Sequence, residues 1–281
     1  MPSSCCGPAI MPSSSIGEAD EASIRLLGHD LAGDLLGRVG FGELAFWLVA
    51  QRGPTPGELR LFEAVLVALA DHGFTPTVIA ARLTLAGAPE SVQGAMAAGL
   101  LGGGSRFLGV TEDCGRFLAD ALADALTDAD ALAGADVPTS DVPTSDDGWD
   151  ALARDAVRAQ HAAGRLVPGL GHPLHKNGDP RTPIMRIAGE EAVTGPHLLL
   201  FQAVGRVHPE ILGRTLPLNG AGVCGAALAD LGFPVSILRG FALLARAAGL
   251  LGHLAEELRR PAGQQIYRQV DRAVTYAPPQ H

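Results

Sequence analysis

The sequence predicts an all-α protein, and three observations lead to this class. Of the 281 residues, 47% are hydrophobic but only 5% are aromatic, a balance typical of helices packed through Ala, Leu and Gly. Apolar residues recur at helical spacing in one segment after another. No alternation of apolar and polar residues is long enough to indicate a strand. At this length the chain can bury one large domain, alone or with a smaller one.

The first clear helix is predicted after Pro54 and Pro56, ending near His72 and Gly73. Its apolar residues recur every three or four positions, as one face of an amphipathic helix requires. They are Leu59, Phe62, Val65, Leu66 and Leu69. Proline before the helix and glycine after it are the usual signals for its two ends.

Further helices are predicted along the rest of the chain. The segment 91–101 runs into the glycines at 102–104, where the backbone must turn. From residue 183 onward, Ala-rich segments are separated by Gly and Pro. The predicted ranges are 76–85, 91–101, 116–132, 149–163, 183–193, 196–208, 219–231 and 235–259.

Two segments lack the pattern of a packed element. Residues 1–20 are rich in Ser and Pro without apolar periodicity, which predicts a disordered leader that carries no chemistry. The tandem repeat DVPTS-DVPTS at 136–145 resists helix formation. We therefore expect a flexible surface loop at 134–148.

The charge and the apolar pattern limit the partners. A formal net charge of −9 opposes nucleic-acid binding, which relies on basic side chains that release counterions. No basic segment followed by an apolar stretch begins the chain, and no charge-free apolar run reaches the roughly 18–20 residues that span a bilayer. We expect no nucleic acid, no export and no membrane.

The cysteines and histidines predict neither disulfides nor a metal. The four cysteines show no zinc-type spacing and no disulfide framework, which fits a reducing cytoplasm. They are the adjacent Cys5 and Cys6 and the isolated Cys114 and Cys224. His161, His175 and His253 likewise lack metal-ligand spacing with one another. The protein is therefore expected to be cytoplasmic and metal-free.

The stretch from Val167 to Arg181, VPGLGHPLHKNGDPR, concentrates residues that carry chemistry. Its glycines around His172 let backbone amides approach a ligand, and Lys176 and Arg181 add positive charge suited to phosphate or carboxylate. On these residues alone a structural turn and an anion-binding loop are equally supported, because short Gly/His motifs are common.

This stretch resembles the PGxGHxxxKxxDPR loop of the citrate synthases and citryl-CoA lyases. Other segments resemble the same family in the same order. They are ADHG at 70–73, LPLN at 216–219 followed by LGFP at 231–234, ARAAGLLGH at 245–253, and RRP at 259–261. The resemblance covers about 25–270 and is nearer to the compact citryl-CoA lyase-like branch.

The resemblance implies an architecture and an assembly. A large helical domain is expected at 21–113 and 223–281, with a smaller helical domain at 114–222 closing over the cleft. The chain is expected to form a homodimer.

The resemblance also implies roles for single residues. His172 corresponds to the general acid/base that polarises the ketone of the oxo-acid, or takes the hydroxyl proton in cleavage. His72 corresponds to a histidine that binds oxaloacetate. Arg181, Arg246 and Arg260 correspond to carboxylate-binding arginines, the last reaching across the dimer. Guanidinium groups suit this task because each pairs two carboxylate oxygens.

The implied ligands are a small carboxylic acid and an acyl thioester. Coenzyme A thioester is a possible substrate, with no tightly bound cofactor. Lys176 corresponds to a basic residue near the CoA phosphates, and Gly169 and Gly171 belong to the same predicted cofactor-binding loop.

Two catalytic positions depart from the family pattern. Phe107 stands where a histidine hydrogen-bonds the thioester enolate, and a register through the glycines 102–104 also lacks a histidine. Ala221 stands where an aspartate removes the methyl proton of acetyl-CoA. Losing either group would cost roughly 10²–10⁴ in rate. Glu112 or Asp113 is a candidate replacement base, although a charge at a helix N-terminus is the better-supported interpretation of both.

Three functions remain open. An enzyme with altered chemistry on a carboxylated acyl substrate would explain the retained histidines and arginines: retro-aldol cleavage, decarboxylation, or condensation with an already activated donor. A pseudoenzyme that binds a CoA ester or a citrate-like acid for a partner is the alternative. A purely structural helical protein leaves the arginines unexplained. Cys224 is interpreted as a buried small residue rather than a nucleophile.

Overall fold

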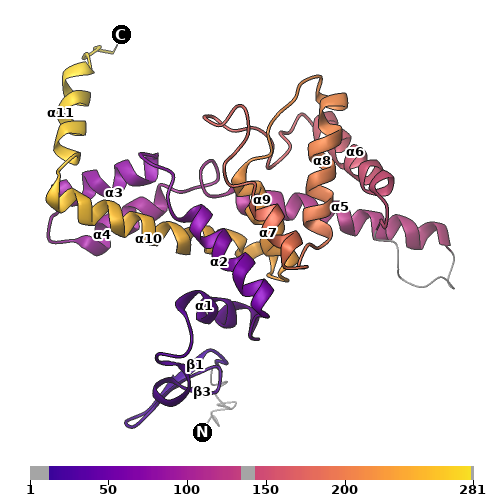
Figure 1. The fold of residues 1–281 in the computed structure, drawn as a ribbon. Helices are drawn as coiled ribbons and strands as arrows, with labels where there is room; N and C mark the ends of the chain where they lie inside the picture. Colours follow the sequence, from indigo (N-terminus) through magenta and orange to yellow (C-terminus); the bar gives the residue numbers. More distant parts are fainter. Residues whose placement is uncertain (1–12, 134–142, 280–281) are drawn as a thin grey trace, which may run out of the picture. The chain divides into compact units, whose positions relative to one another are not determined.

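A computed structural model describes residues 13–133 and 143–279. The chain divides into two compact units, Met1–Thr55 and Pro56–His281. Each unit has its own secondary structure (Figure 1). The predicted division into a large domain at 21–113 and 223–281 and a small domain at 114–222 stays a prediction.

The first unit contains a small antiparallel sheet that the sequence analysis did not predict. Its strands are β1 (Gly17–Ala19), β2 (Ile24–Leu26) and β3 (His29–Asp30), in the order β1-β2-β3. Strands of two or three residues are too short to produce a recognisable alternation. Since β1 lies within the predicted leader 1–20, ordered structure begins before residue 21, while residues 1–12 lie outside the described part.

Two helical elements complete the first unit. The π-helical turn η1 (Leu31–Leu35) follows the sheet, and α1 (Phe41–Ala50) follows η1. Gln51 ends α1 in the left-handed conformation at φ 55°, donating its N–H to the carbonyl of Trp47. Helix α1 is apolar around most of its surface, so it lacks the one-sided periodicity from which helices were predicted.

The second unit is helical, and the main predicted helices are confirmed. They are α2 (Pro56–Ala70), α3 (Pro76–Gly87), α4 (Val92–Leu101), α5 (Val110–Ala133), α6 (Asp146–Ala162), α7 (Ile184–Glu190), α8 (Pro196–Leu212), α9 (Gly220–Asp230), the 3-10 turn η2 (Val235–Ile237), α10 (Leu238–Arg259) and α11 (Gly263–Ala273). Helix α11 was not predicted.

The region around the tandem repeat differs from the prediction at its C-terminal end. Helix α6 begins at Asp146, inside the predicted loop 134–148, because the Ser145 side chain accepts the N–H of Gly148 at 3.3 Å and caps the helix. Residues 134–142 lie outside the described part of the chain.

Helix α10 packs against α2, α3 and α4 (Figure 1). Small and branched apolar residues fill one core at this contact. They are Val78, Ala81, Leu85, Ala95, Leu250 and Leu254. Burial of this surface is the main stabilising contribution here.

Helix α9 is buried almost along its whole length and contacts α2, α5, α7 and α8. Such crowding requires small residues. A Cβ on Gly225 would lie 2.2 Å from the carbonyl oxygen of Thr111. The start of α5 therefore approaches α9 only because residue 225 has no side chain.

One segment among the described residues, Val235–Arg259, has the length and apolar composition that a membrane span needs. Leu250 and Leu254 of this segment lie in the core beside α3 and α4. The core helix of a globular protein has the same composition, so this segment is weak evidence for a membrane.

Candidate active-site cleft

A cavity of about 1000 Å³ lies within the second unit. Its walls come from the end of α2, the start of α3, the turn before α5, the first half of α5, the end of α6, the loop between α6 and α7, the start of α9 and the middle of α10. Eight of the sequence-predicted residues line it: His72, Phe107, Gly169, Gly171, His172, Arg181, Ala221 and Arg246. The structure thus brings together residues spread over most of the second unit's sequence.

The glycine-rich loop is fastened to the segment before α9. The N–H of Gly171 donates to the carbonyl of Pro217 at 2.7 Å, and the N–H of Asn219 donates to the carbonyl of Gly169 at 2.8 Å. The Asn219 side chain donates to the carbonyl of Gly171 at 2.9 Å. Because the N–H of Gly171 is already paired, it is not free for a ligand. Cofactor binding by Gly169 and Gly171 stays a prediction.

Gly169 has a positive φ of 87°, a conformation that favours glycine. A Cβ at this position would also lie 2.6 Å from the Phe201 ring. Both constraints explain a glycine here through packing, independently of any ligand.

Arg181 and Asp179 form a two-bond ion pair beside the cavity. Nε and Nη2 of Arg181 donate to the carboxylate at 2.9 and 2.7 Å. The N–H of Gly220 donates to the same carboxylate at 2.7 Å. Burial raises the pKa of Asp179, but the hydrogen bonds from Arg181 and Gly220 outweigh it and hold that pKa well below its usual range. Asp179 therefore orients Arg181 while Nη1 of the guanidinium keeps its donors.

Arg246 projects from the middle of α10 and is only 4% exposed. Its Nη2 donates to the carbonyl of Leu69 at 3.3 Å, while its Nε has no hydrogen-bond partner within the described residues. Burial lowers the pKa of Arg246, and the charge of Asp71 opposes this shift. A buried guanidinium with an unused donor at a cavity wall suits a carboxylate ligand.

His172 is held in one protonation form by the backbone. Its Nδ1 accepts the N–H groups of Leu174 and His175, each at 3.1 Å. Since both partners can only donate, Nδ1 carries no proton and the neutral ring has its proton on Nε2. Burial lowers the pKa of His172, and His175 adds to the shift. A neutral imidazole with Nε2–H is suited to donate a hydrogen bond to a carbonyl oxygen.

His175 belongs to the same cluster, and the sequence analysis did not place it in the site. Its ring stacks on His172 with 4.4 Å between centroids. Its Nε2 lies 3.3 Å from Nε2 of His72. The spacing His-x-x-His within a glycine-rich loop was the signal that could have identified it.

The three histidines have a spacing that could hold a metal ion, with one nitrogen of each within 4.8 Å of the others. To ligate through Nε2, however, His172 would have to move its proton to Nδ1, which faces two N–H donors. The pattern of backbone hydrogen bonds therefore opposes a three-histidine site. The absence of a metal stays a prediction.

The altered positions lie in the cavity, but Glu112 does not. Phe107 is 48% exposed and lines the cavity together with Ala221. Glu112 instead pairs with Arg116 at 2.9 Å and with Arg239 at 3.5 Å, and it is not among the lining residues. Its neighbour Asp113 does line the cavity. Asp113 is therefore better placed than Glu112 as a replacement base.

Lys176 and Arg260 lie outside this cavity. Both are exposed. Lys176 borders a smaller hollow of about 290 Å³ with Thr182 and Thr215. The role of Arg260 depends on a partner subunit and stays a prediction.

Three arginines that sequence reasoning missed also line the large cavity: Arg106, Arg116 and Arg165. They come from the turn before α5, from α5 itself and from the segment after α6, and no motif in the sequence links them. Burial raises the pKa of Cys224 to about 12, which agrees with a buried thiol rather than a nucleophile.

The second unit is thus a helical domain with a cavity lined by histidines and arginines. Residues 29–269 match the family model described as citrate synthase, C-terminal domain. The chain belongs to the citrate synthase family. A search of curated protein sequences finds no significant match.

Solved structures agree with this assignment. The chain is similar to citryl-CoA lyase from Hydrogenobacter thermophilus, with 26% identity over 96% of this chain and 97% of that chain, and a TM-score of 0.79. ATP citrate lyase from Methanothrix soehngenii, solved with citrate and coenzyme A, is 20% identical over 98% of this chain and 42% of its own, with a TM-score of 0.70.

A more distant likeness is to the citrate synthase of Thermoplasma acidophilum, solved with carboxymethyl coenzyme A and oxaloacetate. Identity is 16% over 86% of this chain and 58% of that chain, with a TM-score of 0.60. The similarities at 20% and 16% identity support the fold alone. The predicted citrate synthase-like fold is confirmed as a mostly helical one that also carries the small sheet β1-β2-β3, while the homodimer stays a prediction.

Proposed function

We propose that this protein is an enzyme that binds a citrate-like acid and an acyl thioester and changes a C–C bond without enolising acetyl-CoA. One observation carries the proposal: His72, His172, Arg181 and Arg246 converge on a single cavity. We call these four residues the acid-binding set. The geometry of the set supports recognition of a carboxylated oxo-acid or hydroxy-acid.

The acid-binding set has the charges and donors that such an acid requires. Arg181 and Arg246 offer guanidinium donors to carboxylates. His172 offers an Nε2–H donor to a ketone or hydroxyl oxygen. The citrate and oxaloacetate in the related solved structures make a di- or tricarboxylic acid the first ligand class to test.

We call Phe107 and Ala221 the altered pair. Their side chains exclude two groups from the reaction: a base and a hydrogen-bond donor at these positions. Neither side chain has a group that removes a proton or donates a hydrogen bond to an enolate oxygen. Retro-aldol cleavage, decarboxylation and condensation with an already activated donor each reduce the demand for the missing base, because none of them begins by removing a proton from a thioester methyl group.

Citryl-CoA cleavage is a retro-aldol reaction and is the first activity to test, because this chain is similar to a citryl-CoA lyase. The C–C bond that breaks would leave its electrons on the acetyl-CoA enolate, so a group other than Phe107 or Ala221 would have to deliver the proton to its carbon.

Coenzyme A thioester is the acyl carrier we propose, as a substrate rather than a bound cofactor. Coenzyme A, citryl-CoA and carboxymethyl coenzyme A are present in the related structures. Arg106, Arg116 and Arg165 supply positive charge at the cavity for phosphates. Lys176, at the smaller hollow, is a less direct candidate for that task.

Binding and turnover assays together test the proposal. Citrate, oxaloacetate and coenzyme A are titrated by calorimetry, and citryl-CoA, citrate with CoA, and oxaloacetate with acetyl-CoA are screened by mass spectrometry. Acid binding together with cleavage or another C–C change is expected. Failure to bind any di- or tricarboxylic acid would contradict the proposal.

A second function, a pseudoenzyme that binds such ligands for a partner, is favoured by one observation. Both groups of the altered pair are chemically inert, and Glu112 lies outside the cavity and is already paired. Tight acid or CoA-ester binding with no product from any combination would establish this alternative.

We also propose a cytoplasmic homodimer: the dimer is what the motif resemblance implies, and the buried free thiols of Cys114 and Cys224 are compatible with a reducing compartment. Light scattering tests the dimer, and cell fractionation tests the location. A stable monomer would remove the cross-subunit role of Arg260.

A further inference from the structure

The turn that carries His72 is held from behind by a chain of polar contacts to α3 and α10. We propose that His253 is a positioning residue, which acts with Arg82 to hold the turn 71–74 and thereby keeps His72 oriented in the cavity. We call the chain Arg82–His253–Asp71 the relay. That His72 binds an acid rests on the proposed function. That the relay holds the turn beside His72 rests on the contacts alone.

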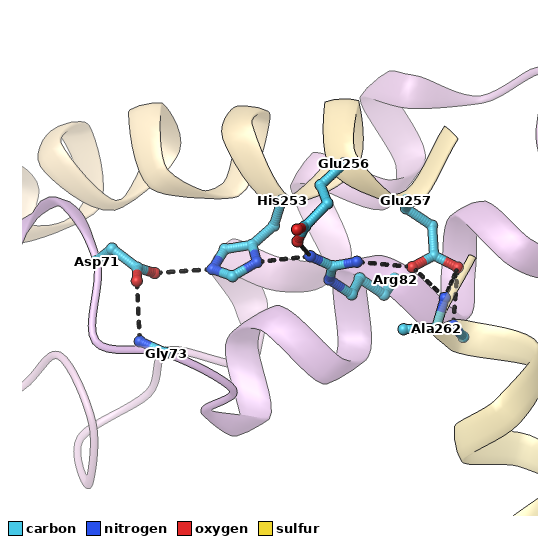
Figure 2. A network of polar contacts seen from close by, with 8 residues as sticks. Asp71, Gly73, Arg82, His253, Glu256, Glu257 and Ala262 are labelled. Atoms are coloured by element: carbon cyan, nitrogen blue, oxygen red, sulfur yellow. Dashed lines mark hydrogen bonds and ion pairs between the residues drawn. The ribbon is translucent and has the colours of Figure 1, made fainter. Parts of the chain in front are cut away.

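The relay reaches both chain neighbours of His72 (Figure 2). Nε2 of His253 lies 2.9 Å from Oδ1 of Asp71. The other carboxylate oxygen of Asp71 accepts the N–H of Gly73 at 2.9 Å. Gly73 has a positive φ of 70°, so the turn is sharp and its direction is set at that residue. Holding residues 71 and 73 restricts the direction in which residue 72 points.

The protonation of the relay follows from its chemistry. Nη2 of Arg82 lies 2.9 Å from Nδ1 of His253. A guanidinium can only donate, so Nδ1 of His253 must accept, and the ring proton lies on Nε2 and is donated to Asp71. The hydrogen bonds therefore run in one direction, from Arg82 through His253 to Asp71. A glutamine at 253 could accept and donate in the same way, whereas a leucine could do neither.

An aromatic residue of the same turn packs on the relay. The Arg82 guanidinium lies 4.8 Å from the centre of the Phe74 ring, and the His253 ring meets Phe74 edge to face at 5.7 Å. Such contacts between a cation and a ring contribute to the stability of a partly exposed site. The relay thus contacts Asp71 and Phe74 directly, and it holds Gly73 through Asp71.

The relay is anchored in the interior. Arg82 is fully buried at 0% exposed and pairs with Glu257 at 2.9 Å and with Glu256 (Figure 2). The Glu257 carboxylate accepts the N–H groups of Ala262 and Gly263, the latter at 2.7 Å, where α11 begins. A buried arginine with these partners is a fixed point against which His253 can hold the turn.

The same side of α10 supports the end of α2. Arg246 donates to the carbonyl of Leu69. A Cβ on Gly249 would lie 2.0 Å from the carbonyl oxygen of Ala70. Arg246, Gly249 and His253 follow one another at three and four residues, so they share one face of the helix. His253 extends this contact between α10 and the end of α2 to Asp71, the residue before His72.

The surroundings of His72 provide a readout that needs no ligand. Its ring faces His172 at 5.1 Å between centroids and His175 at 5.4 Å, with Arg181 and Arg246 as nearby charges. Burial, followed by the charge of Arg181, lowers the pKa of His72. If the turn is released, His72 moves toward solvent and its pKa rises toward the ordinary value near 6.5.

The experiment compares three variants of the full chain. His253→Leu removes both relay contacts, and His253→Gln retains a donor and an acceptor. His197→Leu is the matched control, because His197 makes another histidine–aspartate pair, with Asp230 at 2.9 Å, and does not line the cavity. The His72 ring is titrated by NMR, with its signal assigned through His72→Gln, and citrate affinity is measured by calorimetry.

In His253→Leu we expect the pKa of His72 to rise and citrate to bind about tenfold more weakly, below the roughly 100-fold cost of a 1 Å misplacement at a reacting centre. His253→Gln is expected to restore most of both quantities, and His197→Leu to leave both unchanged. An unchanged titration in His253→Leu, no rescue by His253→Gln, or an equal shift in His197→Leu would each overturn the proposal. If the wild type binds no citrate, acid binding fails as a function while the titration still decides the role of His253.

Discussion

The acid-binding set and the altered pair share one cavity but are supported differently. Arg181 forms a two-bond ion pair with Asp179, Nδ1 of His172 accepts two backbone N–H groups, and Arg246 donates to the carbonyl of Leu69 at the end of α2. The side chains of Phe107 and Ala221 have no polar group with which to make such a contact. The contacts that hold the acid-binding set therefore do not involve the side chains of Phe107 and Ala221, so the set can be retained when those two positions change.

The largest expected effect is at His172. His172→Ala should abolish turnover, with a loss of about 10²–10⁴ if the ring acts as acid or base, while the protein remains folded because the ring is only partly buried. Steady-state kinetics on the substrate found by the screen, with circular dichroism as the fold control, provides the check. The matched control is His161→Ala on the exposed side of α6. Full activity in His172→Ala would remove the mechanistic role of the acid-binding set.

A smaller effect is expected at Arg181. Arg181→Ala should weaken citrate binding by about 100-fold, since breaking a buried charge pair costs about 2–5 kcal/mol, partly through the carboxylate that is left unpaired. Arg181→Lys keeps the charge but loses the two-bond geometry with Asp179. The citrate affinity of Arg181→Lys should therefore lie between that of the wild type and that of Arg181→Ala. Calorimetry at fixed ionic strength measures all three, and equal affinity in wild type and Arg181→Ala would show that the acid binds elsewhere.

The altered pair predicts an absent reaction. The wild-type protein should not exchange the methyl protons of acetyl-CoA with deuterium oxide above the buffer background, even with an oxo-acid analogue bound. Mass spectrometry of the recovered thioester measures this exchange. Exchange above background would show that another base acts, with Asp113 as the first candidate because it lines the cavity and Glu112 as the second.

Restoring the family's histidine and aspartate at the altered pair tests the same absence of exchange. The double variant Phe107→His with Ala221→Asp should gain exchange, and either single variant should gain much less, because base and enolate donor serve one transition state. Citrate affinity serves as the control for the acid-binding set and should change little. Equal exchange in a single and the double variant would contradict the cooperation of the two positions.

The smallest expected effect is a pH dependence of stability that arises from Asp179. Its pKa is held below the usual value near 3.8, so the ion pair contributes stability above that pH, and the contribution is lost as pH falls through the lower, folded-state pKa. Chemical denaturation between about pH 5 and pH 3 should show the onset of this loss, which continues at lower pH. Asp179→Asn should show a flatter dependence on pH over the same range. An identical slope in both proteins would contradict the assignment.

Local sequence signals predicted much of the helical fold and part of the site. Leu59 to Leu69 repeat at helical spacing and form α2, whereas the strands at 17–30 and helix α1 lack one-sided patterns long enough to detect. Helix α11 has a one-sided pattern after Gly263, but the sequence analysis predicted no helix beyond residue 259. The motif resemblance identified His72 and His172, while His175 entered the site only through its position in space.

By itself, the sequence determined the helical class, the family resemblance and the chemical identity of the altered pair, because these depend on residue types and on spacing along the chain. Only the tertiary structure decided that His175 stacks on His172, that Glu112 is paired outside the cavity, and that His253 reaches the turn beside His72. Asp71 and His253 are 182 residues apart. Contacts of that kind follow from how α2, α3 and α10 pack together, and no local pattern encodes them.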